Sequence, residues 1–296
     1  MRSADALGVA SMLAWGAAYV PSAWLVETWP PIAAAGARLA LGGLLLLGLL
    51  AALGRPLRPR VGPVAVGWLA LTQTVLFYGA VFWGIDRQGA GLPAVLANTD
   101  PLFVAVLAAA FLGETLSRRQ WLGLLVGLVG AAVVVWDGPL WPPSLSATAL
   151  VVVGGAFAWS VGTVVAARGV RGRADPVALA AWQMAVGGAA LLVGGLVGEG
   201  VPDAGPRELG LILLLAVIGS ALPFALFYVA LQRAPAAEVS AWFFLVPVVG
   251  VLTAWPLLGE TPTVQLVGGM VGVSAGLWLV LGTAGRGRLV DSPAPP

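Results

Sequence analysis

The sequence predicts an all-α integral membrane protein with ten transmembrane helices, arranged as two inverted repeats of five helices with both termini inside. Three observations predict this fold. Only 9% of the 296 residues are charged and 59% are hydrophobic, whereas a soluble globular chain carries about 25% charged residues. The arginines gather between alternate apolar runs, and the two halves of the chain share motifs at a nearly constant spacing.

Ten apolar runs are each long enough to cross a bilayer, which takes about 20 mostly apolar residues. Segments rich in Pro, Gly and Arg separate them, and no connection is long enough to hold a soluble domain. The first run exceeds the 7–15 residues of a signal-peptide core, so we interpret it as a mature span. The predicted helices cover residues 6–26, 32–53, 63–85, 91–112, 118–135, 147–168, 176–197, 208–231, 236–258 and 263–282.

Arginine placement orients these helices. With the N-terminus inside, the inner segments carry twelve arginines and the outer loops carry only Arg87 and Arg207, while Arg38 lies within the second run. Cytoplasmic loops of membrane proteins are enriched in basic residues. The split therefore predicts an even number of spans with both ends in the cytoplasm. The tail over residues 286–296 is polar and rich in proline, which predicts that it is disordered.

An internal repeat divides the chain into residues 1–140 and 141–285. The sequence Leu-Gly-Glu-Thr at 112–115 returns at 258–261, and Pro101 returns as Pro247, both at a spacing of 146 residues. Ala14-Trp15 returns as Ala158-Trp159, and Gly42-Gly43 as Gly187-Gly188. Since each half holds five spans, an odd number, the second half enters the membrane in the opposite sense. Such inverted repeats favour alternating access to a site near the membrane midplane.

These motifs resemble the EamA-like branch of the drug/metabolite transporter superfamily over nearly the whole chain. The resemblance rests on the stretches from Pro to Gly-Glu at 101–114 and 247–260, and on the Gln-x-x-Gly motifs at 120–123 and 265–268. Trp15-Gly16 and Arg38 also fit, whereas Gln183 stands where Arg38 would repeat. The resemblance implies a multi-pass protein of the cell inner or plasma membrane that exports amino acids or other small metabolites, often driven by protons.

The composition excludes several other functions. The chain has no Lys, His or Cys, so it offers no Schiff-base lysine, no His or Cys metal site and no lysine-containing nucleotide loop. We expect no cofactor, no metal, no enzymatic activity and no nucleic-acid partner. The expected partners are a small-molecule substrate and the lipid bilayer. An uncoupled channel, a lipid scramblase and a lipid-acting membrane enzyme remain as alternatives.

Two charged residues lie clearly within predicted spans, where insertion of an Arg or Asp costs about 2.5–3.5 kcal/mol. Asp100 precedes Pro101, which removes a backbone donor and breaks the helix locally. We expect Asp100 either to bind the coupling proton or a cationic group, or to form an ion pair with Arg38. Arg38 serves either that ion pair or a substrate carboxylate.

Polar and aromatic side chains on other spans predict a substrate cavity. Span one carries Ser11, Trp15, Tyr19 and Ser22 on one helix face, and Trp159 repeats Trp15. Ordinary helix packing is the alternative for each of these residues. The predicted substrate-binding residues are Trp15, Tyr19, Tyr78, Asn98, Trp159, Thr163 and Gln183, with Gln73 and Thr74 as weaker candidates.

Two further features favour structural roles. Glu114 and Glu260 stand at span ends, where a carboxylate can cap the next helix; gating is the alternative. Small-residue stripes run through Gly123 and Gly127 in span five and through Gly268, Gly272 and Gly276 in span ten. Because such stripes let helices approach closely, they predict either a scaffold contact or a homodimer contact.

Overall fold

The computed structural model describes every residue except 1–2, 89–95, 136–146, 173, 259–263 and 282–296, and throughout the described part the secondary structure is helical. Among the described residues, six helices are long and apolar enough to cross a membrane, and three shorter apolar helices accompany them. Where the structure describes them, the helices lie over the predicted ranges, with ends that differ by a few residues. That all ten cross the bilayer, with both ends inside, stays a prediction.

The first half contains α1 (Ser3–Ala17), α2 (Tyr19–Val26), α3 (Pro31–Ala52), α4 (Pro63–Leu69), η1 (Ala70–Leu76), α5 (Phe77–Gln88), α7 (Asp100–Leu112) and α8 (Arg118–Val135). The single span predicted over 6–26 is therefore interrupted at Ala18, between α1 and α2. The helix predicted over 91–112 is broken by a turn at Asn98 and Thr99, just before Pro101. That break is the one expected from a proline that lacks a backbone donor.

The second half contains α9 (Ala147–Gly172), α10 (Pro176–Gly198), α11 (Pro206–Ala216), η2 (Val217–Ala221), α12 (Leu222–Arg233), α13 (Ala236–Ala241), η3 (Trp242–Phe244), α14 (Leu245–Leu258) and α15 (Val264–Leu281). Each half has a π-helical segment inside its third span: η1 in the first half and η2 in the second. Residue 70, where η1 begins, lies 147 positions before the start of η2. π-Helical segments often mark functional positions.

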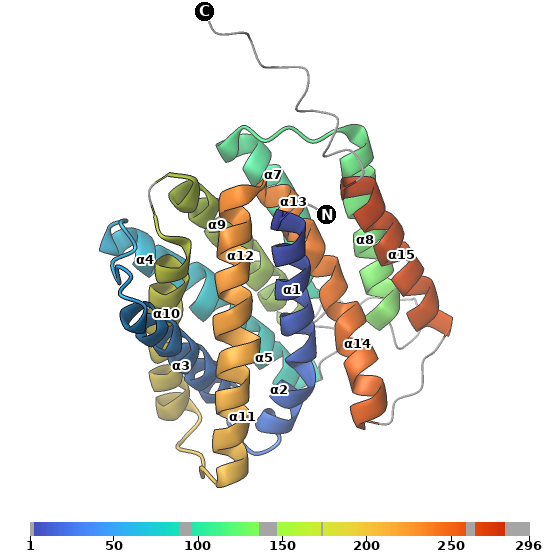
Figure 1. The fold of residues 1–296 in the computed structure, drawn as a ribbon. Coiled ribbons are helices and arrows are strands. Elements are labelled where there is room, and N and C mark those ends of the chain that lie inside the picture. Colours follow the sequence, from blue (N-terminus) through green and yellow to red (C-terminus); the bar gives the residue numbers. More distant parts are fainter. Residues whose placement is uncertain (1–2, 89–95, 136–146, 173, 259–263, 282–296) are drawn as a thin grey trace, which may run out of the picture.

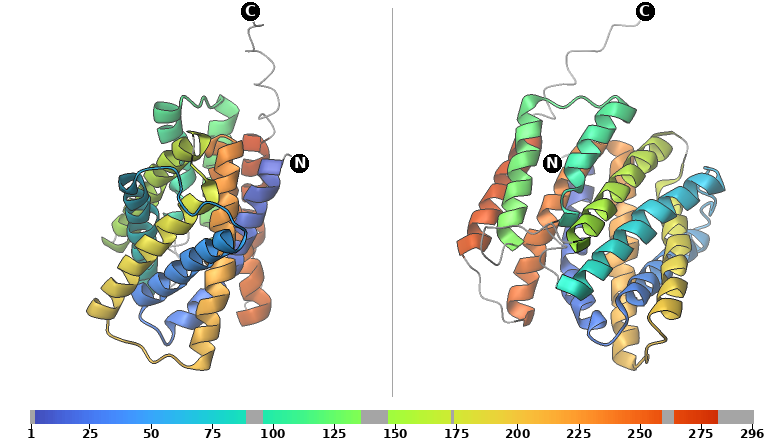
Figure 2. Two further views of the ribbon diagram at one scale, coloured as in Figure 1. Left: turned by 60° about the vertical axis from the view of Figure 1, so that its left-hand side comes forward. Right: turned by 180° about the vertical axis from the view of Figure 1, so that it is seen from behind.

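Equivalent helices of the two halves pack against each other in two pairs, α3 with α10 and α8 with α15. Figures 1 and 2 show α8 and α15 side by side at one edge of the bundle. Further contacts are related by exchanging each helix for its equivalent in the other half. Thus α1 packs on α12 and its equivalent α9 packs on α5; likewise α1 packs on α14 and α9 packs on α7. This exchange is what a twofold relation between the halves requires, so the two-repeat architecture fits the structure.

Glycines allow this close packing. A Cβ at Gly43 would meet the backbone of Ala185, and a Cβ at Gly188 would meet the backbone of Ala40, in both cases at less than 3 Å. In the same way a Cβ at Gly276 would meet the backbone of Gly127. The small-residue stripes of α8 and α15 therefore contact each other within one chain, which is the scaffold role of the two that the sequence left open. The stripes therefore no longer support a homodimer, which stays a prediction.

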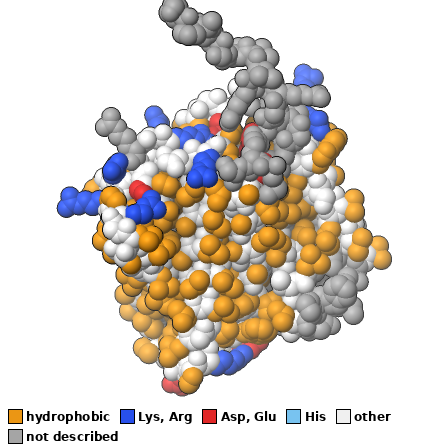
Figure 3. Space-filling view, viewed as in Figure 1, with side chains coloured by type: hydrophobic (Ala, Val, Ile, Leu, Met, Phe, Trp, Pro, Cys, Tyr) orange, Lys and Arg blue, Asp and Glu red, His pale blue; other side chains and the backbone are white. Residues whose placement is uncertain are grey.

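The surface has the pattern of a membrane protein. Hydrophobic side chains cover the middle of the molecule in Figure 3, and arginines gather toward the end where the N-terminus lies. Many large apolar side chains are exposed on the outside of the helices, among them Val64, Val197 and Trp278. Lipid is the solvent that such a surface fits.

Candidate functional site

A cavity of about 80 Å³ lies between α1 and α2, α5, the segment at residues 97–98 and the start of α14. This volume has room for several water molecules. The cavity is lined mostly by apolar side chains, and those of Tyr19, Ser22, Arg38, Tyr78 and Asn98 supply its polar groups. Helices of both halves contribute to it, since Trp159, Phe243 and Val246 come from the second half.

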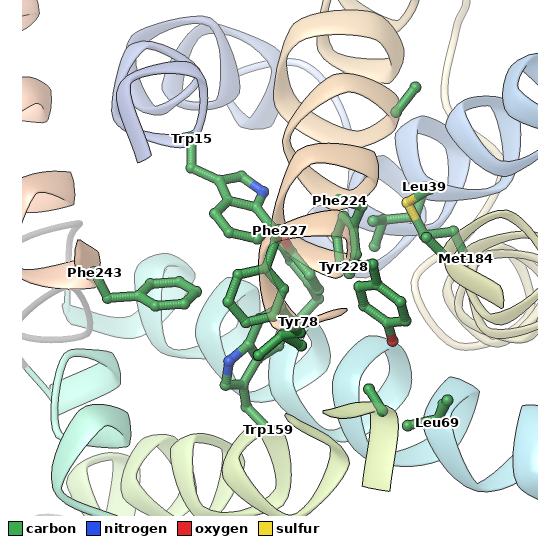
Figure 4. Packing of buried hydrophobic residues seen from close by; sticks show 14 of the residues in the cluster. Trp15, Leu39, Leu69, Tyr78, Trp159, Met184, Phe224, Phe227, Tyr228 and Phe243 are labelled. Atoms are coloured by element: carbon green, nitrogen blue, oxygen red, sulfur yellow. The ribbon is translucent and has the colours of Figure 1, made fainter. Parts of the chain in front are cut away.

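Aromatic rings close one side of the cavity. Trp15 stacks on Phe243 with ring centroids 5.2 Å apart, and it meets Trp159 edge-on at 5.8 Å. Phe224 and Phe227 complete the cluster, at 5.3 and 5.6 Å from Trp15. Figure 4 shows these rings directed toward one another from different helices. Offset and edge-on pairs of this kind add about 0.5–1.5 kcal/mol each beyond burial. These contacts hold the rings in place as one wall of the cavity.

Arg38 is the charged residue among the described residues that line the cavity, and only 4% of its surface is exposed. Its Nη1 donates to the Ser22 hydroxyl at 3.0 Å, and Ser22 donates onward to the Ala18 carbonyl at 2.7 Å. The guanidinium carbon lies 5.1 Å from the ring centroid of Tyr78 and 5.4 Å from that of Phe82. Within the described residues Nε has no acceptor.

Asp100 is also buried, at 1% exposure, but it does not line the cavity. It begins α7 beside Pro101, and its backbone carbonyl accepts a hydrogen bond from Ser160 at 3.2 Å. Neither carboxylate oxygen has a hydrogen-bond partner in the described part of the chain. The ion pair predicted between Arg38 and Asp100 is absent from the described contacts: the guanidinium contacts Ser22 and two aromatic rings instead.

Two predicted cavity residues, Thr163 and Gln183, lie elsewhere, in a buried polar network around η1. Gln73 donates to the Thr163 hydroxyl at 3.1 Å and accepts a hydrogen bond from the Tyr228 hydroxyl. Thr74 donates to the Gln183 side-chain carbonyl at 2.7 Å. In this conformation the network joins helices of the two halves, and it is separate from the cavity.

Of the other predicted residues, Trp15, Tyr19, Tyr78, Asn98 and Trp159 do line the cavity. Ser11 is not among the lining residues, and its hydroxyl donates to the Pro223 carbonyl at 2.8 Å. The sequence analysis missed the phenylalanines of the wall. For Phe224 a signal existed, since it lies 146 residues after Tyr78, the spacing of the repeat.

Glu114 caps a helix, but a different one from the helix predicted. Its carboxylate accepts from the backbone N–H groups of Ala236 and Ala237, at the start of α13, at 2.8 and 3.1 Å. It also pairs with Arg171 of α9 at 2.8 Å. The predicted cap on α8 is therefore wrong: Gly113, with φ +68°, ends α7 and the carboxylate reaches α13 of the other half. Glu260 lies outside the described residues.

Comparison with known proteins gives consistent results. The sequence matches the EamA-like transporter family over residues 2–136 and 146–282. It is 27% identical to the "Uncharacterized inner membrane transporter YedA" of Escherichia coli (strain K12), with 83% of this chain and 80% of that protein covered.

A second relative, the "Probable terminal-alkyne amino-acid exporter" of Streptantibioticus cattleyicolor, is 30% identical, with 71% of each chain covered. Curated relatives match over 64% to 98% of their own length. A solved structure titled "Crystal structure of protein" superposes with a TM-score of 0.79 at 20% identity, covering 96% of this chain and 99% of that one. This last likeness supports the fold alone.

Proposed function

The chain belongs to the EamA-like transporter family, and from this membership we propose that it is a secondary active transporter that exports a small metabolite such as an amino acid. Protons drive export, and the two inverted five-helix repeats alternate access to the cavity. The protein is a multi-pass protein of the cell membrane, as its apolar helices and its inner-membrane relative indicate. Family and relatives are named as transporters rather than enzymes.

The observation that carries this proposal is a cavity between the halves with a buried arginine at its side. Sites at the interface of inverted repeats are typical of alternating-access carriers. The aromatic wall favours a carrier over an uncoupled channel or scramblase, because a continuous pore needs an open path and this cluster closes one side of the cavity. The amino-acid exporter among the relatives supports the cargo class.

The direction in which the cavity faces follows from the proposed topology. With the N-terminus inside, α2 and the end of α5 lie toward the outer surface, and they line the cavity through Val26 and Ile85. The Glu114–Arg171 pair lies at the opposite, arginine-rich end, where it ties α9 to α13. We therefore assign this conformation to an outward-facing state with the cytoplasmic side closed.

Asp100 is the proposed carrier of the coupling proton. It begins α7, a helix that packs on both α9 and α13 of the other half, so a proton on its side chain acts where the halves meet. Intramembrane carboxyl groups commonly serve as proton relays in transporters. Since Asp100 does not line the cavity, cargo and proton occupy separate places in this proposal.

The test compares metabolites released by cells that express the native chain, Asp100→Asn or Asp86→Asn at equal level. Asp86 is an exposed control on α5. We expect one class of compound to accumulate outside with the native chain and the control, and to fall at least tenfold with Asp100→Asn. Normal release by Asp100→Asn would remove the proton role while keeping the exporter, and no release by any chain would contradict export.

A further inference from the structure

We infer that the cargo is a small organic anion, whose carboxylate binds Arg38 and whose apolar or aromatic body packs on the Trp15–Phe243 side of the cavity, with no cationic group required. This inference rests on the proposed function, because it treats the cavity as the cargo site. It adds a chemical rule to that proposal: the carboxylate of the cargo is necessary for binding, and an ammonium group weakens binding, so an amino acid binds less tightly than the matching acid without the ammonium.

The first step concerns the charge of Arg38. A guanidinium buried within a membrane span is costly unless an anion or a set of acceptors satisfies it. The described residues give it the Ser22 hydroxyl as an acceptor, the ring faces of Tyr78 and Phe82 with the Tyr78 hydroxyl close by, and no carboxylate within salt-bridge distance. Asp100, the other intramembrane charge considered above, makes no contact with it. A ligand carboxylate in the cavity would therefore satisfy the charge of Arg38.

The second step concerns the geometry of Arg38. Ser22 holds Nη1 in place, and Ser22 is itself fixed by its bond to the Ala18 carbonyl. Tyr78 and Phe82 lie against the guanidinium carbon. These contacts leave Nε without an acceptor among the described residues. A guanidinium held in this way can present two parallel N–H groups to a carboxylate, the arrangement that makes arginine a strong carboxylate binder.

The third step concerns the rest of the cargo. Among the described residues the cavity lining contains no Asp or Glu. Apart from Arg38 and the neutral polar groups of Ser22, Asn98 and the two tyrosines, its walls are aromatic and aliphatic. An ammonium group in this space would meet no carboxylate among the described lining residues, and it would be repelled by Arg38 in a medium of low dielectric constant. An apolar or aromatic body, in contrast, would pack on the rings of Trp15 and Phe243 and be shielded from water.

Three probes of one shape test this rule. They are 3-phenylpropionate, which carries only the carboxylate, phenylalanine, which carries both charges, and phenethylamine, which carries only the ammonium. Each is added to the purified full-length protein in detergent, and the thermal unfolding midpoint is measured. A ligand that binds the folded state raises this midpoint. We therefore expect the largest rise with 3-phenylpropionate, a smaller rise with phenylalanine and no rise with phenethylamine. No rise with the propionate, or an equal rise with the amine, would overturn the inference.

Arg38→Gln places at this position the residue found at the equivalent position of the second half, Gln183. We expect it to weaken the binding of 3-phenylpropionate by about tenfold to a hundredfold, the range for loss of hydrogen bonds to a charged group. Arg58→Gln, at an exposed arginine, is the matched control and should bind like the native chain. Native-like binding by Arg38→Gln would contradict the assignment of the carboxylate to Arg38.

A second measurement leaves Arg38 intact, in case Arg38→Gln does not fold. The chain has no native cysteine, so Ala23→Cys places one thiol in the cavity lining. We expect 3-phenylpropionate to slow maleimide labelling of this thiol and phenethylamine to leave the rate unchanged. Protection by the amine alone would overturn the inference. Both assays measure binding and neither measures export. If 3-phenylpropionate binds but is not exported by cells that express the chain, that result contradicts the proposed function and leaves this inference standing.

Discussion

Arg38 and Gln183 occupy equivalent positions in the two halves of the chain, yet only Gln183 is hydrogen-bonded to the π-helical segment that it faces. Gln183 of α10 accepts from Thr74 of η1 at 2.7 Å. Arg38 of α3 lies beside Gly219 of η2, and the neighbouring Ser220 hydroxyl has no partner among the described residues. The Gln183 side chain is thus held in a hydrogen-bonded network, whereas the Arg38 guanidinium lines a cavity where a ligand can bind.

The π-helical segments explain the difference. Position 73 in η1 is a glutamine, and its long side chain fills the space toward α9 and bonds to Thr163 and to Tyr228. The equivalent position in η2, 146 residues later, is Gly219. With no side chain there, space remains beside η2 for the guanidinium of Arg38. We infer that the two halves have the same backbone arrangement but different roles at this position: structural packing around Gln183 and ligand binding at Arg38.

The largest expected effect tests the shared backbone arrangement. Gly43→Leu and Gly188→Leu each push a side chain into the backbone of the partner helix, Ala185 in one case and Ala40 in the other. Overpacking costs about 1–3 kcal/mol where side chains can yield, and here backbone must move, so we expect both variants to lose the folded monodisperse protein. Size-exclusion chromatography and thermal unfolding in detergent measure this.

The controls for that experiment lie on the same two helices. A Cβ at Gly48 of α3 or at Gly194 of α10 would meet no atom within 4 Å, so Gly48→Leu and Gly194→Leu should fold normally. Because the contacts of Gly43 and Gly188 exchange under the twofold relation, their losses should be similar. A severe loss for one and none for the other would break the equivalence of the halves.

A smaller effect sharpens the contrast between the two sites. Thr74→Val removes the donor to the Gln183 carbonyl and leaves that oxygen buried and unpaired, which costs about 1–3 kcal/mol. Ser220→Ala, at the equivalent position of η2, removes a buried hydroxyl with no partner in the described structure. It leaves no unpaired group behind, so the stability should change much less than with Thr74→Val. Thermal unfolding of the two variants in one detergent compares them. Equal losses would show that Ser220 makes a bond as important as that of Thr74.

The sequence was sufficient to predict where the described helices lie, a two-repeat architecture that fits the structure, and the break before Pro101, because these depend on local composition and on matched spacing. It also identified Trp15, Tyr78 and Trp159, which line the cavity. It could not distinguish cavity from packing for Thr163 and Gln183. That outcome depends on which helix faces which, and a polar side chain at mid-span satisfies the same pattern in either place. The partner of Glu114 was missed for the same reason, since α13 is 122 residues away.

The smallest effect concerns how the equivalent helices α3 and α10 begin. Asp175 immediately precedes α10 and accepts from the N–H groups of Val177 and Ala178 at 3.0 and 2.9 Å. The start of α3 is capped from the other half, by Glu199, which accepts from Ile32 at 3.0 Å. Asp175→Ala should cost about 1 kcal/mol, whereas Asp175→Asn keeps a side-chain oxygen for the cap and should cost much less.

Asp175→Asn also removes the ion pair with Arg55, which is 2.6 Å long but partly exposed, so that pair contributes at most about 1 kcal/mol. Thermal unfolding at low and high salt separates the two contributions, since salt screens the exposed pair and leaves the cap unchanged. A cost for Asp175→Asn equal to that for Asp175→Ala, and vanishing at high salt, would mean that the ion pair rather than the cap stabilises this helix start. In that case the first turns of α3 and α10 would both be stabilised by residues distant in the sequence. The two halves would then resemble each other more at these helix starts than at their π-helical segments.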